Sequence, residues 1–361
     1  MERDRVLVGM SGGVDSAAAA ALLQEAGYAV TGCTLKLYDG PALDREEGTC
    51  CGLEDIEDAR RTAYRLGADF FVFNCKELFR REVMADFAAA YRDGRTPNPC
   101  VRCNRFVKFD ALLRRAEDLG IGRIATGHYA RVDLDAGTGR WRLLRGRDRR
   151  KDQSYFLYPL TQEQLSRLLL PLGELEKGDV RAFAEARGLA SARKPDSQDI
   201  CFVPGGDYTA FLRHWGMALE PGDFVDTAGR VLGRHRGLAC YTIGQRRGLG
   251  VSGGRPLYVL GKDPARNAVI LGDEGALYRS TVWVENFHWV SLPPQEKPIE
   301  AAAKTRYSQS EASGVLYPEG DGLVRMVFDE PQRAVTAGQS LVCYCGEAVA
   351  GGGVICRAAP E

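Results

Sequence analysis

The fold is decided by Gly9-Met10-Ser11-Gly12-Gly13-Val14-Asp15-Ser16. This stretch follows an apolar run at 6–8, typical of a buried strand, and leads into an alanine-rich run at 15–26 that predicts a helix closed by Gly27. Glycines at such a junction let the backbone turn tightly and direct free N–H groups, with the positive end of the helix dipole, at an anion. The loop has no Walker lysine and is not Gly-x-Gly-x-x-Gly, so it predicts neither a kinase-like nor a dinucleotide site.

Strand-like and helical segments alternate outward from this loop as far as about residue 130. The apolar, strand-like segments are 30–37, 70–73 and 123–125. The helical patterns are 54–66, 77–91 and 107–119. This alternation predicts an α/β domain with a parallel sheet and helices on both of its faces.

The alternation of strand-like and helical segments ends at about residue 130. A hairpin pattern at 131–146 precedes two helical patterns at 162–170 and 179–187, and after about residue 220 the segments become short, β-branched or aromatic. We expect three parts: an α/β domain over 1–210, a small central β-rich domain over 211–279 and a C-terminal β-barrel over 280–361.

Composition excludes several classes of protein. The 361 residues include 48 Lys+Arg and 48 Asp+Glu, so the net charge is zero and any anion must be met by a local patch. No run approaches the roughly 18 apolar residues of a membrane span, and the N-terminus leads straight into a strand, which predicts a cytoplasmic protein with no membrane partner. Eleven cysteines, an odd number, argue against a disulfide scaffold.

Two cysteines lie three residues apart in Thr96-Pro97-Asn98-Pro99-Cys100-Val101-Arg102-Cys103-Asn104. We expect a proline-braced loop just ahead of a helix, where Arg102, Arg105 and the helix N-terminus favour thiolate over thiol. A third cysteine, Cys201, lies in a polar, turn-forming segment at 196–202. Half a zinc site and incidental thiols are the alternative interpretations, although no second pair with zinc-ribbon spacing is present.

Basic residues are concentrated between residues 140 and 152. Seven arginines and lysines face two aspartates there, and Trp141 and Tyr155 are interleaved with them. Such a hairpin suits a phosphate backbone and an unstacked base. The alternative is a solvated basic hairpin without a ligand.

Taken in order, these segments resemble the bacterial tRNA-specific 2-thiouridylases, which belong to the PP-loop ATP pyrophosphatase superfamily. The resemblance spans nearly the whole chain and continues in Thr126-Gly127-His128-Tyr129, 151–157, 244–250, 304–307 and 337–340. It implies a Rossmann-like PP-loop domain of the adenine nucleotide alpha hydrolase type. It also implies a cytoplasmic sulfurtransferase that thiolates C2 of the wobble uridine of tRNA: ATP adenylates the C2 oxygen, and sulfur from a cysteine persulfide on the protein replaces it, releasing AMP and pyrophosphate.

The resemblance assigns roles residue by residue. Cys103 aligns with the nucleophile and Cys201 with the persulfide carrier, and the two would form a disulfide between turnovers. The implied ATP-binding residues are Gly9, Met10, Ser11, Gly12, Gly13, Val14, Asp15, Ser16, Leu35 and Gly127. The implied contacts to the target base and to tRNA are Asn98, Pro99, Cys100, His128, Lys151, Asp152, Gln153, Arg306, Tyr307 and Gln339.

ATP is expected with Mg²⁺, which Asp15 would help to hold, and the sulfur donor would be a cysteine desulfurase or a sulfur-relay protein. One departure matters: family members have Asp at the position of Cys100, and a thiol does not inherit a carboxylate's role. One alternative is therefore a [4Fe–4S] cluster held by Cys100, Cys103 and Cys201. An amidating PP-loop synthetase and a non-catalytic tRNA-binding protein are two further alternatives.

Overall fold

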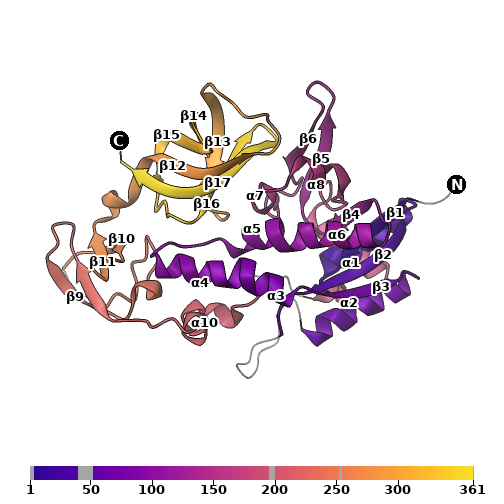
Figure 1. The fold of residues 1–361 in the computed structure, drawn as a ribbon, viewed down its shortest axis with the longest axis horizontal. Helices are drawn as coiled ribbons and strands as arrows, with labels where there is room; N and C mark the ends of the chain where they lie inside the picture. Colours follow the sequence, from indigo (N-terminus) through magenta and orange to yellow (C-terminus); the bar gives the residue numbers. More distant parts are fainter. Residues whose placement is uncertain (1–3, 40–51, 195–199, 252–253, 361) are drawn as a thin grey trace.

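The computed structural model describes residues 4–39, 52–194, 200–251 and 254–360. Its N-terminal part is a parallel five-stranded sheet in the order β3-β2-β1-β4-β7 (Figure 1). The strands are β1 (Arg5–Gly9), β2 (Ala29–Lys36), β3 (Phe70–Asn74), β4 (Arg123–Thr126) and β7 (Leu168–Leu169). The parallel α/β sheet predicted from the sequence is confirmed.

Helices cover both faces of this sheet because successive side chains of a strand point to opposite sides. Val6 and Val8 of β1 pack with alanines of two helices on one face, whereas Leu7 packs with Leu112 on the other. The first face is covered by α1 (Val14–Glu25) and α2 (Leu53–Arg65), and the second by α6 (Asp110–Asp118). Outside them, α9 (Lys177–Ala186) packs on α1.

Two helical segments of this domain are built from consecutive pieces that include a π-helical stretch. The first comprises α3 (Lys76–Phe79), the π-helix at Arg80–Met84 and α4 (Ala85–Arg92). The second comprises α5 (Pro99–Cys103), the π-helix at Asn104–Phe109 and α6. This second segment starts at Pro99, whereas the sequence predicted a start near residue 107.

The remaining helices are short. They are α7 (Ser154–Leu157), α8 (Gln162–Arg167) and α10 (Tyr208–His214), with 3₁₀ turns at Ala190–Arg193, Pro204–Gly206, Leu238–Cys240 and Glu274–Leu277. The helix predicted over 162–170 ends at Arg167, because Leu168 and Leu169 pair with β4 as a short parallel strand.

The central part is a four-stranded sheet in the order β10-β11-β8-β9. Its strands are β8 (Gly222–Val225), β9 (Val231–His235), β10 (Tyr258–Asp263) and β11 (Ala268–Gly272). The pair β11–β8 is parallel and the other two pairs are antiparallel.

The C-terminal part is a closed barrel, in agreement with the expected fold class. Six strands follow the order β12-β15-β14-β13-β16-β17, and pairing of β12 with β17 closes the ring. They are β12 (Tyr278–Trp289), β13 (Ile299–Lys304), β14 (Ala312–Gly320), β15 (Leu323–Arg333), β16 (Ser340–Cys345) and β17 (Ala348–Ala359).

The predicted hairpin joins the first domain to this barrel. It consists of β5 (Ala130–Asp135) and β6 (Arg140–Arg145), and Leu144 of β6 pairs with Ala348 of β17 (Figure 1). Within the described residues, no helix is both long and apolar enough to cross a membrane.

Candidate active site

The glycine-rich loop leaves the carboxyl end of β1 and is held in one conformation by its own contacts. Ser16 Oγ accepts a hydrogen bond from the Ser11 backbone N–H at 3.1 Å and donates to the Gly13 carbonyl at 3.1 Å. Gly12 has φ +77°, and a Cβ there would lie 2.3 Å from the carbonyl oxygen of Asp55. The loop is therefore fixed against α2 at a position that only glycine can occupy.

Gly127 brings the end of β4 against the same loop. A Cβ at Gly127 would lie 2.7 Å from the carbonyl carbon of Asp15 and 2.8 Å from the backbone nitrogen of Ser16. Leu35 lies near the carboxyl end of the adjacent strand β2. The structure thus gathers the predicted ATP-binding residues, which come from three separate segments, at one edge of the sheet.

Within the described residues, the side chains of Lys177 and Tyr129 contact the carboxylate of Asp15. Lys177 Nζ lies 2.7 Å from Asp15 Oδ1 and 2.8 Å from Oδ2, and the Tyr129 hydroxyl donates to Oδ1 at 2.8 Å. The Lys177 side chain is nearly buried. Both carboxylate oxygens of Asp15 thus already face a protein cation, and the expected role of Asp15 as a Mg²⁺ ligand stays a prediction.

The first turn of α5 carries two of the three candidate thiols. Asn98 caps the helix by accepting a hydrogen bond from the Val101 N–H at 3.3 Å, and Pro99 occupies the first helical position. The expected loop is thus already helix at Cys100 and Cys103. Cys100 is exposed, whereas Cys103 is buried.

Arg102 is neutralised by acids of the neighbouring helical segment. Its Nε lies 3.3 Å from a carboxylate oxygen of Asp86, and its Nη2 lies 3.7 Å from one of Glu82. The guanidinium also lies over the ring of Phe106, 4.9 Å from its centroid. These ion pairs reduce the positive charge that Arg102 was expected to offer the two thiols.

Cys103 and Cys201 share one hydrophobic cluster. Cys103 is buried with Phe79 and Phe202, and Cys201, which is half-buried, packs against the same group. The Tyr38 hydroxyl donates a hydrogen bond to the Cys201 carbonyl. Residues 195–199 of the predicted polar segment lie outside the described residues.

The three candidate thiols do not form a ligand set for a metal. Throughout the part of the chain that the structure describes, no group of three or more His, Cys, Asp or Glu side chains converges so that it could hold a metal ion. The alternative of a [4Fe–4S] centre held by Cys100, Cys103 and Cys201 stays a prediction, which the cysteine variants described below test.

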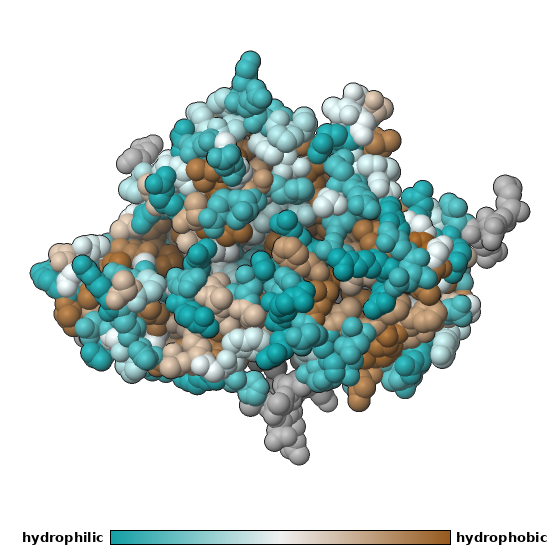
Figure 2. All heavy atoms as spheres, in the orientation of Figure 1, coloured by the Kyte–Doolittle hydropathy of each residue, from teal (hydrophilic) through white to brown (hydrophobic). Residues whose placement is uncertain are grey.

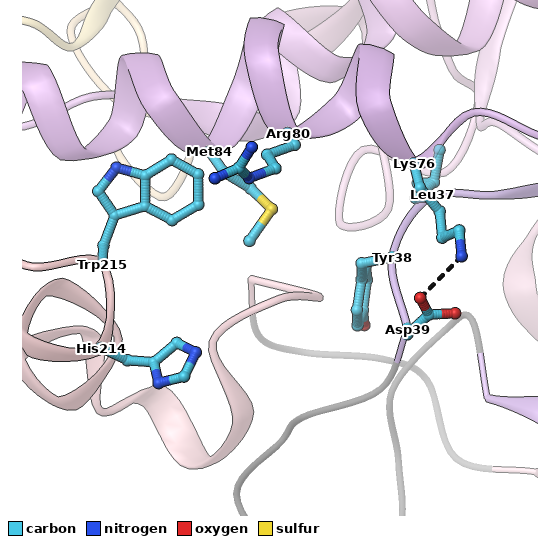
Figure 3. Close-up of a pocket in the computed structure, with 8 residues that line it drawn as sticks. All are labelled: Leu37, Tyr38, Asp39, Lys76, Arg80, Met84, His214 and Trp215. Carbon is cyan, nitrogen blue, oxygen red and sulfur yellow. Dashed lines mark hydrogen bonds and ion pairs between the residues drawn. The ribbon is translucent and has the colours of Figure 1, made fainter.

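A cavity of about 510 Å³ (Figure 3) is lined in part by residues of the hydrophobic cluster that contains Cys103. Tyr38, which binds the Cys201 carbonyl, is one of its lining residues, and Lys76 pairs with Asp39 at its rim at 2.7 Å. The full lining is Leu37, Tyr38, Asp39, Lys76, Arg80, Met84, His214 and Trp215.

The barrel holds the segment that leads into α5. Gln339 Nε2 donates to the carbonyl oxygens of Thr96 at 3.0 Å and Pro97 at 3.1 Å. The Thr96 N–H donates to the Ala337 carbonyl at 3.0 Å. The barrel thereby fixes the backbone directly before Asn98, the first of the predicted base-contacting residues.

An aromatic group lies at the same junction. Tyr155 hydrogen-bonds with Asn98 and donates to the Ser340 carbonyl at 2.8 Å. The ring centroid of Tyr307 lies 4.4 Å from that of Phe156 and 5.9 Å from that of Tyr155. The predicted residues Asn98, Tyr307 and Gln339 are thus brought together by contacts between the first domain and the barrel.

His128 follows Gly127 and is held by Thr126, whose Oγ1 lies 2.8 Å from His128 Nδ1. Burial, with a smaller contribution from Lys108, lowers the pKa of His128 to about 3. The imidazole is therefore neutral at physiological pH, and the tRNA contact expected of His128 stays a prediction.

The predicted tRNA-contacting residues Lys151, Asp152 and Gln153 differ in exposure. Asp152 is buried, and its Oδ1 accepts the N–H groups of Gly146 at 3.0 Å and Ser154 at 3.1 Å. The side chain of Asp152 therefore holds the turn together, and Lys151 is more exposed than Asp152.

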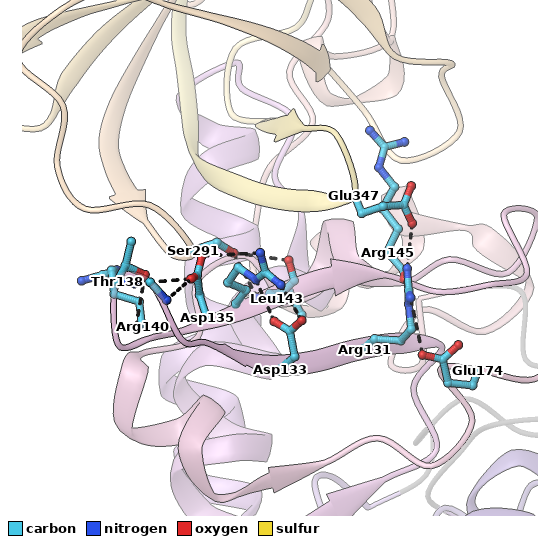
Figure 4. Close-up of polar contacts among 12 residues, drawn as sticks. Arg131, Asp133, Asp135, Thr138, Arg140, Leu143, Arg145, Glu174, Ser291 and Glu347 are labelled. Carbon is cyan, nitrogen blue, oxygen red and sulfur yellow. Dashed lines mark hydrogen bonds and ion pairs between the residues drawn. The ribbon is translucent and has the colours of Figure 1, made fainter.

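Ion pairs neutralise much of the basic hairpin (Figure 4). Arg142 pairs with Asp133 at 2.6 Å and with Asp135 at 3.5 Å. Arg145 pairs with Glu311, and Arg149 with Glu347. Among the described residues, no ion pair involves the exposed Arg147 or Arg150.

Figure 2 shows hydrophilic side chains over most of the face seen in Figure 1.

Comparison with known proteins places this site in a family. Family models match the tRNA methyl transferase HUP domain over residues 4–205, the tRNA methyl transferase PRC-barrel domain over 209–273 and the aminomethyltransferase β-barrel domain over 279–355. The tRNA-specific 2-thiouridylase of Acetivibrio thermocellus is 48% identical over 98% of this chain and 100% of its own. The 2-thiouridylase of Moorella thermoacetica is 50% identical over 97% of this chain and 98% of its own.

The chain belongs to the tRNA-specific 2-thiouridylase family. Within this 2-thiouridylase scaffold, sequence reasoning did not identify Lys177 and did not give Tyr129 a partner. No motif connects either residue with Asp15. The Lys177 contact depends on how α9 packs against α1, and the Tyr129 contact depends on how the segment after β4 packs against α1. The one available signal is weak: Lys177 lies two residues before the helix predicted over 179–187.

Proposed function

We propose that the protein is an ATP-dependent tRNA-uridine 2-sulfurtransferase that replaces the C2 oxygen of the wobble uridine with sulfur. The observation that carries this proposal is the shared cluster of Cys103 and Cys201, which are far apart in the sequence. Cys103 must reach the Sγ atom of Cys201 to release the transferred sulfur, and the shared packing brings the two thiols into the same region.

The reaction begins with activation of the base. The uridine is pulled from its stack, since C2 lies on an edge otherwise hidden in the anticodon loop. Its C2 oxygen attacks the α-phosphorus of ATP, a P–O bond to pyrophosphate breaks, and pyrophosphate leaves. The backbone N–H groups of the loop at 9–16 and the N-terminus of α1 hold the phosphates.

Sulfur transfer follows on the adenylated base. The terminal sulfur of a Cys201 persulfide attacks C2, and the C2–O bond breaks with release of AMP. The Cys103 thiolate then attacks Cys201 Sγ, which breaks the S–S bond and leaves sulfur on the base. The resulting Cys103–Cys201 disulfide is reduced by an external thiol before the next turnover.

The partners follow from this scheme. ATP is the cosubstrate and is expected to carry Mg²⁺ on its phosphates, with Asp15 as the residue that would help to hold the ion. A cysteine desulfurase or a sulfur-relay protein supplies the persulfide to Cys201. We place the reaction in the cytoplasm, with a tRNA that has a wobble uridine as substrate.

The test combines two products in one reaction. Purified protein is incubated with tRNA, α-labelled ATP and a persulfide donor, and nucleosides from the tRNA are analysed by mass spectrometry. We expect 2-thiouridine and AMP in equal amounts. ADP formed in step with product would contradict the scheme, and a methylated base formed only with S-adenosylmethionine would favour the methyl transfer named in the family model.

Cysteine variants test the assigned roles. Cys103→Ser and Cys201→Ser should abolish 2-thiouridine formation, whereas Cys100→Ser should retain most of it. Cys240→Ser, at a half-buried thiol of the central domain, is the matched control and should behave as wild type. Equal loss in all three active-site variants, with activity restricted to anaerobically iron-reconstituted protein, would contradict the persulfide scheme.

A further inference from the structure

A chain of polar contacts links the basic segment after the hairpin to the glycine-rich loop. Lys177 is the first residue of α9, and its ammonium group binds both carboxylate oxygens of Asp15. The backbone N–H of the same residue donates to Asp148 Oδ2 at 3.1 Å. Asp148 Oδ1 in turn accepts the N–H of Arg150 at 3.0 Å. One lysine therefore contacts both the loop and the basic segment.

Tyr129 forms a second connection between the same two places. Its hydroxyl donates to Asp15 Oδ1, and its backbone exchanges two hydrogen bonds with Gln153: Tyr129 N–H to Gln153 Oε1 at 2.9 Å, and Gln153 N–H to the Tyr129 carbonyl at 2.8 Å. Asp15 is thus held from two sides by residues that are anchored in the segment 147–153.

The connection is stiff because its members are packed as well as hydrogen-bonded. Tyr129 is buried with Ala18 and Ala19 of α1 and with Val180 of α9. Lys177 Nζ also lies 5.6 Å from the centroid of the Tyr129 ring. A displacement of the segment 147–153 must therefore shift Lys177 and Tyr129, and with them Asp15.

The two ends of the connection bind different ligands in the proposed function. At one end, the exposed Arg147 and Arg150 have no ion pair within the described residues, so they can meet RNA phosphates. At the other end, Asp15 belongs to the loop against which Gly127 packs. A ligand that fixes the segment 147–153 therefore also fixes the carboxylate within the ATP loop.

We propose that Lys177 is a positioning residue that couples tRNA binding at residues 147–153 to ATP binding at the glycine-rich loop. The proposal rests on the proposed function for the identity of both ligands. Lys177 touches neither ligand in this account: it orders Asp15 when tRNA orders Asp148. Coupling between two sites is reciprocal, so each ligand must tighten the binding of the other by the same factor.

The experiment measures binding rather than catalysis. The affinity for a non-cleavable α,β-methylene ATP analogue is determined by calorimetry with and without saturating tRNA. We expect tRNA to tighten this binding in the wild type by about 5- to 150-fold, the usual range of coupling between sites. The factor should fall in Lys177→Met, in which only the link through Tyr129 remains, and Lys177→Arg should recover part of the loss because it keeps the charge.

A control and a second variant separate coupling from folding. Lys297→Met removes an exposed lysine in the barrel and should keep the wild-type factor. Asp148→Ala leaves the Lys177–Asp15 ion pair in place but removes its link to the basic segment, so the factor should fall there too. Thermal unfolding of each variant shows whether it is folded.

Two results would overturn the proposal: a wild-type protein whose affinity for the analogue is unaffected by tRNA, or folded Lys177→Met and Asp148→Ala variants that both retain the wild-type factor. Failure of the proposed function is distinguishable from these results. A protein that shows the coupling but forms no 2-thiouridine retains the Lys177 inference and loses the proposed reaction. A protein that thiolates tRNA without any coupling retains the proposed reaction and loses the Lys177 inference.

Discussion

At Gly127, the missing side chain lets β4 end directly against the ATP loop. A Cβ would meet backbone atoms of Asp15 and Ser16 at 2.7 and 2.8 Å, and backbone atoms cannot rotate aside as a flexible side chain can. Gly127→Ala should therefore weaken binding of an ATP analogue by at least about 10-fold, which corresponds to roughly 1.4 kcal/mol. Calorimetric titration measures this change.

The matched control for this prediction is Gly122→Ala. Gly122 directly precedes β4, and a Cβ there would meet nothing within 4 Å. The variant should bind the analogue as the wild type does. Similar affinities in both alanine variants would show that the close approach at Gly127 does not shape the ATP site.

The lowered pKa of His128 leads to a prediction about how the stability of the protein depends on pH. Its pKa is lowered to about 3 in the folded protein, whereas an unfolded histidine titrates near 6.5. Between these values the unfolded state binds more protons, so the free energy of unfolding decreases as the pH falls below about 6.5. The contribution approaches at most about 1.4 kcal/mol per pH unit.

Urea unfolding of the wild type and of His128→Asn at pH 5, 6, 7 and 8 tests this expectation. The variant should lose stability less steeply between pH 7 and pH 5, and the two proteins should have parallel profiles above pH 7. Identical slopes below pH 6 would place the proton uptake elsewhere, for example at His288, whose pKa is also lowered by burial.

Local sequence signals and their limits are both visible at the level of single residues. The Ser-Gly-Gly-x-Asp-Ser pattern predicted the anion-binding loop because glycine and the helix start are local features. The Lys177–Asp15 ion pair was not predictable, since it joins two helices whose packing is set by the tertiary fold. Pairing of Arg102 with Glu82 and Asp86 escaped prediction for the same reason.

At the scale of elements, the helix that carries Cys100 and Cys103 shows how two signals compete. Apolar periodicity predicts a helix from about residue 107, whereas the helical segment begins at Pro99. Asn98 as a cap and Pro99 as the first helical residue are typical of a helix start, but prolines also mark loops. The helix begins at the cap, and Cys100 and Cys103 therefore both lie on a helix.

The basic segment allows a prediction about salt dependence. Arg147 and Arg150 are exposed and have no ion pair in the described part of the chain, whereas Arg142 is neutralised by Asp133 and Asp135. Each unpaired arginine that meets a phosphate contributes close to one unit of slope to a plot of log K against log salt. Arg147→Ala/Arg150→Ala should reduce the slope by about two units in filter binding.

The control double variant is Arg142→Gln/Asp133→Asn, which removes an opposite charge pair from the same hairpin. Its slope should equal that of the wild type, because no net charge is lost. An unchanged slope in the Arg147/Arg150 variant would place the phosphate contacts elsewhere, with Arg306 of the barrel as the next candidate.

At the scale of the whole molecule, the three parts predicted from local texture are joined by contacts that the sequence does not encode locally. The hairpin β5–β6 belongs to the first domain in sequence, yet β6 pairs with β17 of the barrel. Such pairing depends on which sheet edge lies nearby, and alternating side chains specify a strand but not its partner. The order of strand-like and helical segments predicted the classes of structure correctly, whereas packing between distant segments brings the site residues together.

The contact between Gln339 of the barrel and the segment before α5 leads to a prediction about catalysis. The side chain donates to two backbone carbonyls, Thr96 and Pro97, directly ahead of Asn98. A hydrogen bond of this kind contributes about 1 kcal/mol net, so the loss of two should cost roughly 10-fold or more in kcat/KM for tRNA. Binding of an ATP analogue without tRNA should stay at the wild-type value, because the loop at 9–16 keeps all of its contacts.

Gln339→Ala is compared with Gln295→Ala in steady-state assays of 2-thiouridine formation. Gln295 also donates its side-chain amide to a proline carbonyl, that of Pro293 at 2.8 Å, but it does so within the barrel. We expect the kcat/KM of Gln295→Ala to match that of the wild type. A loss of kcat/KM confined to Gln339→Ala would then measure the contribution of the two hydrogen bonds from the barrel to the segment before α5. Equal activity in the two variants would mean that the remaining contact, from Thr96 to Ala337, is enough to keep the base-binding residues in place.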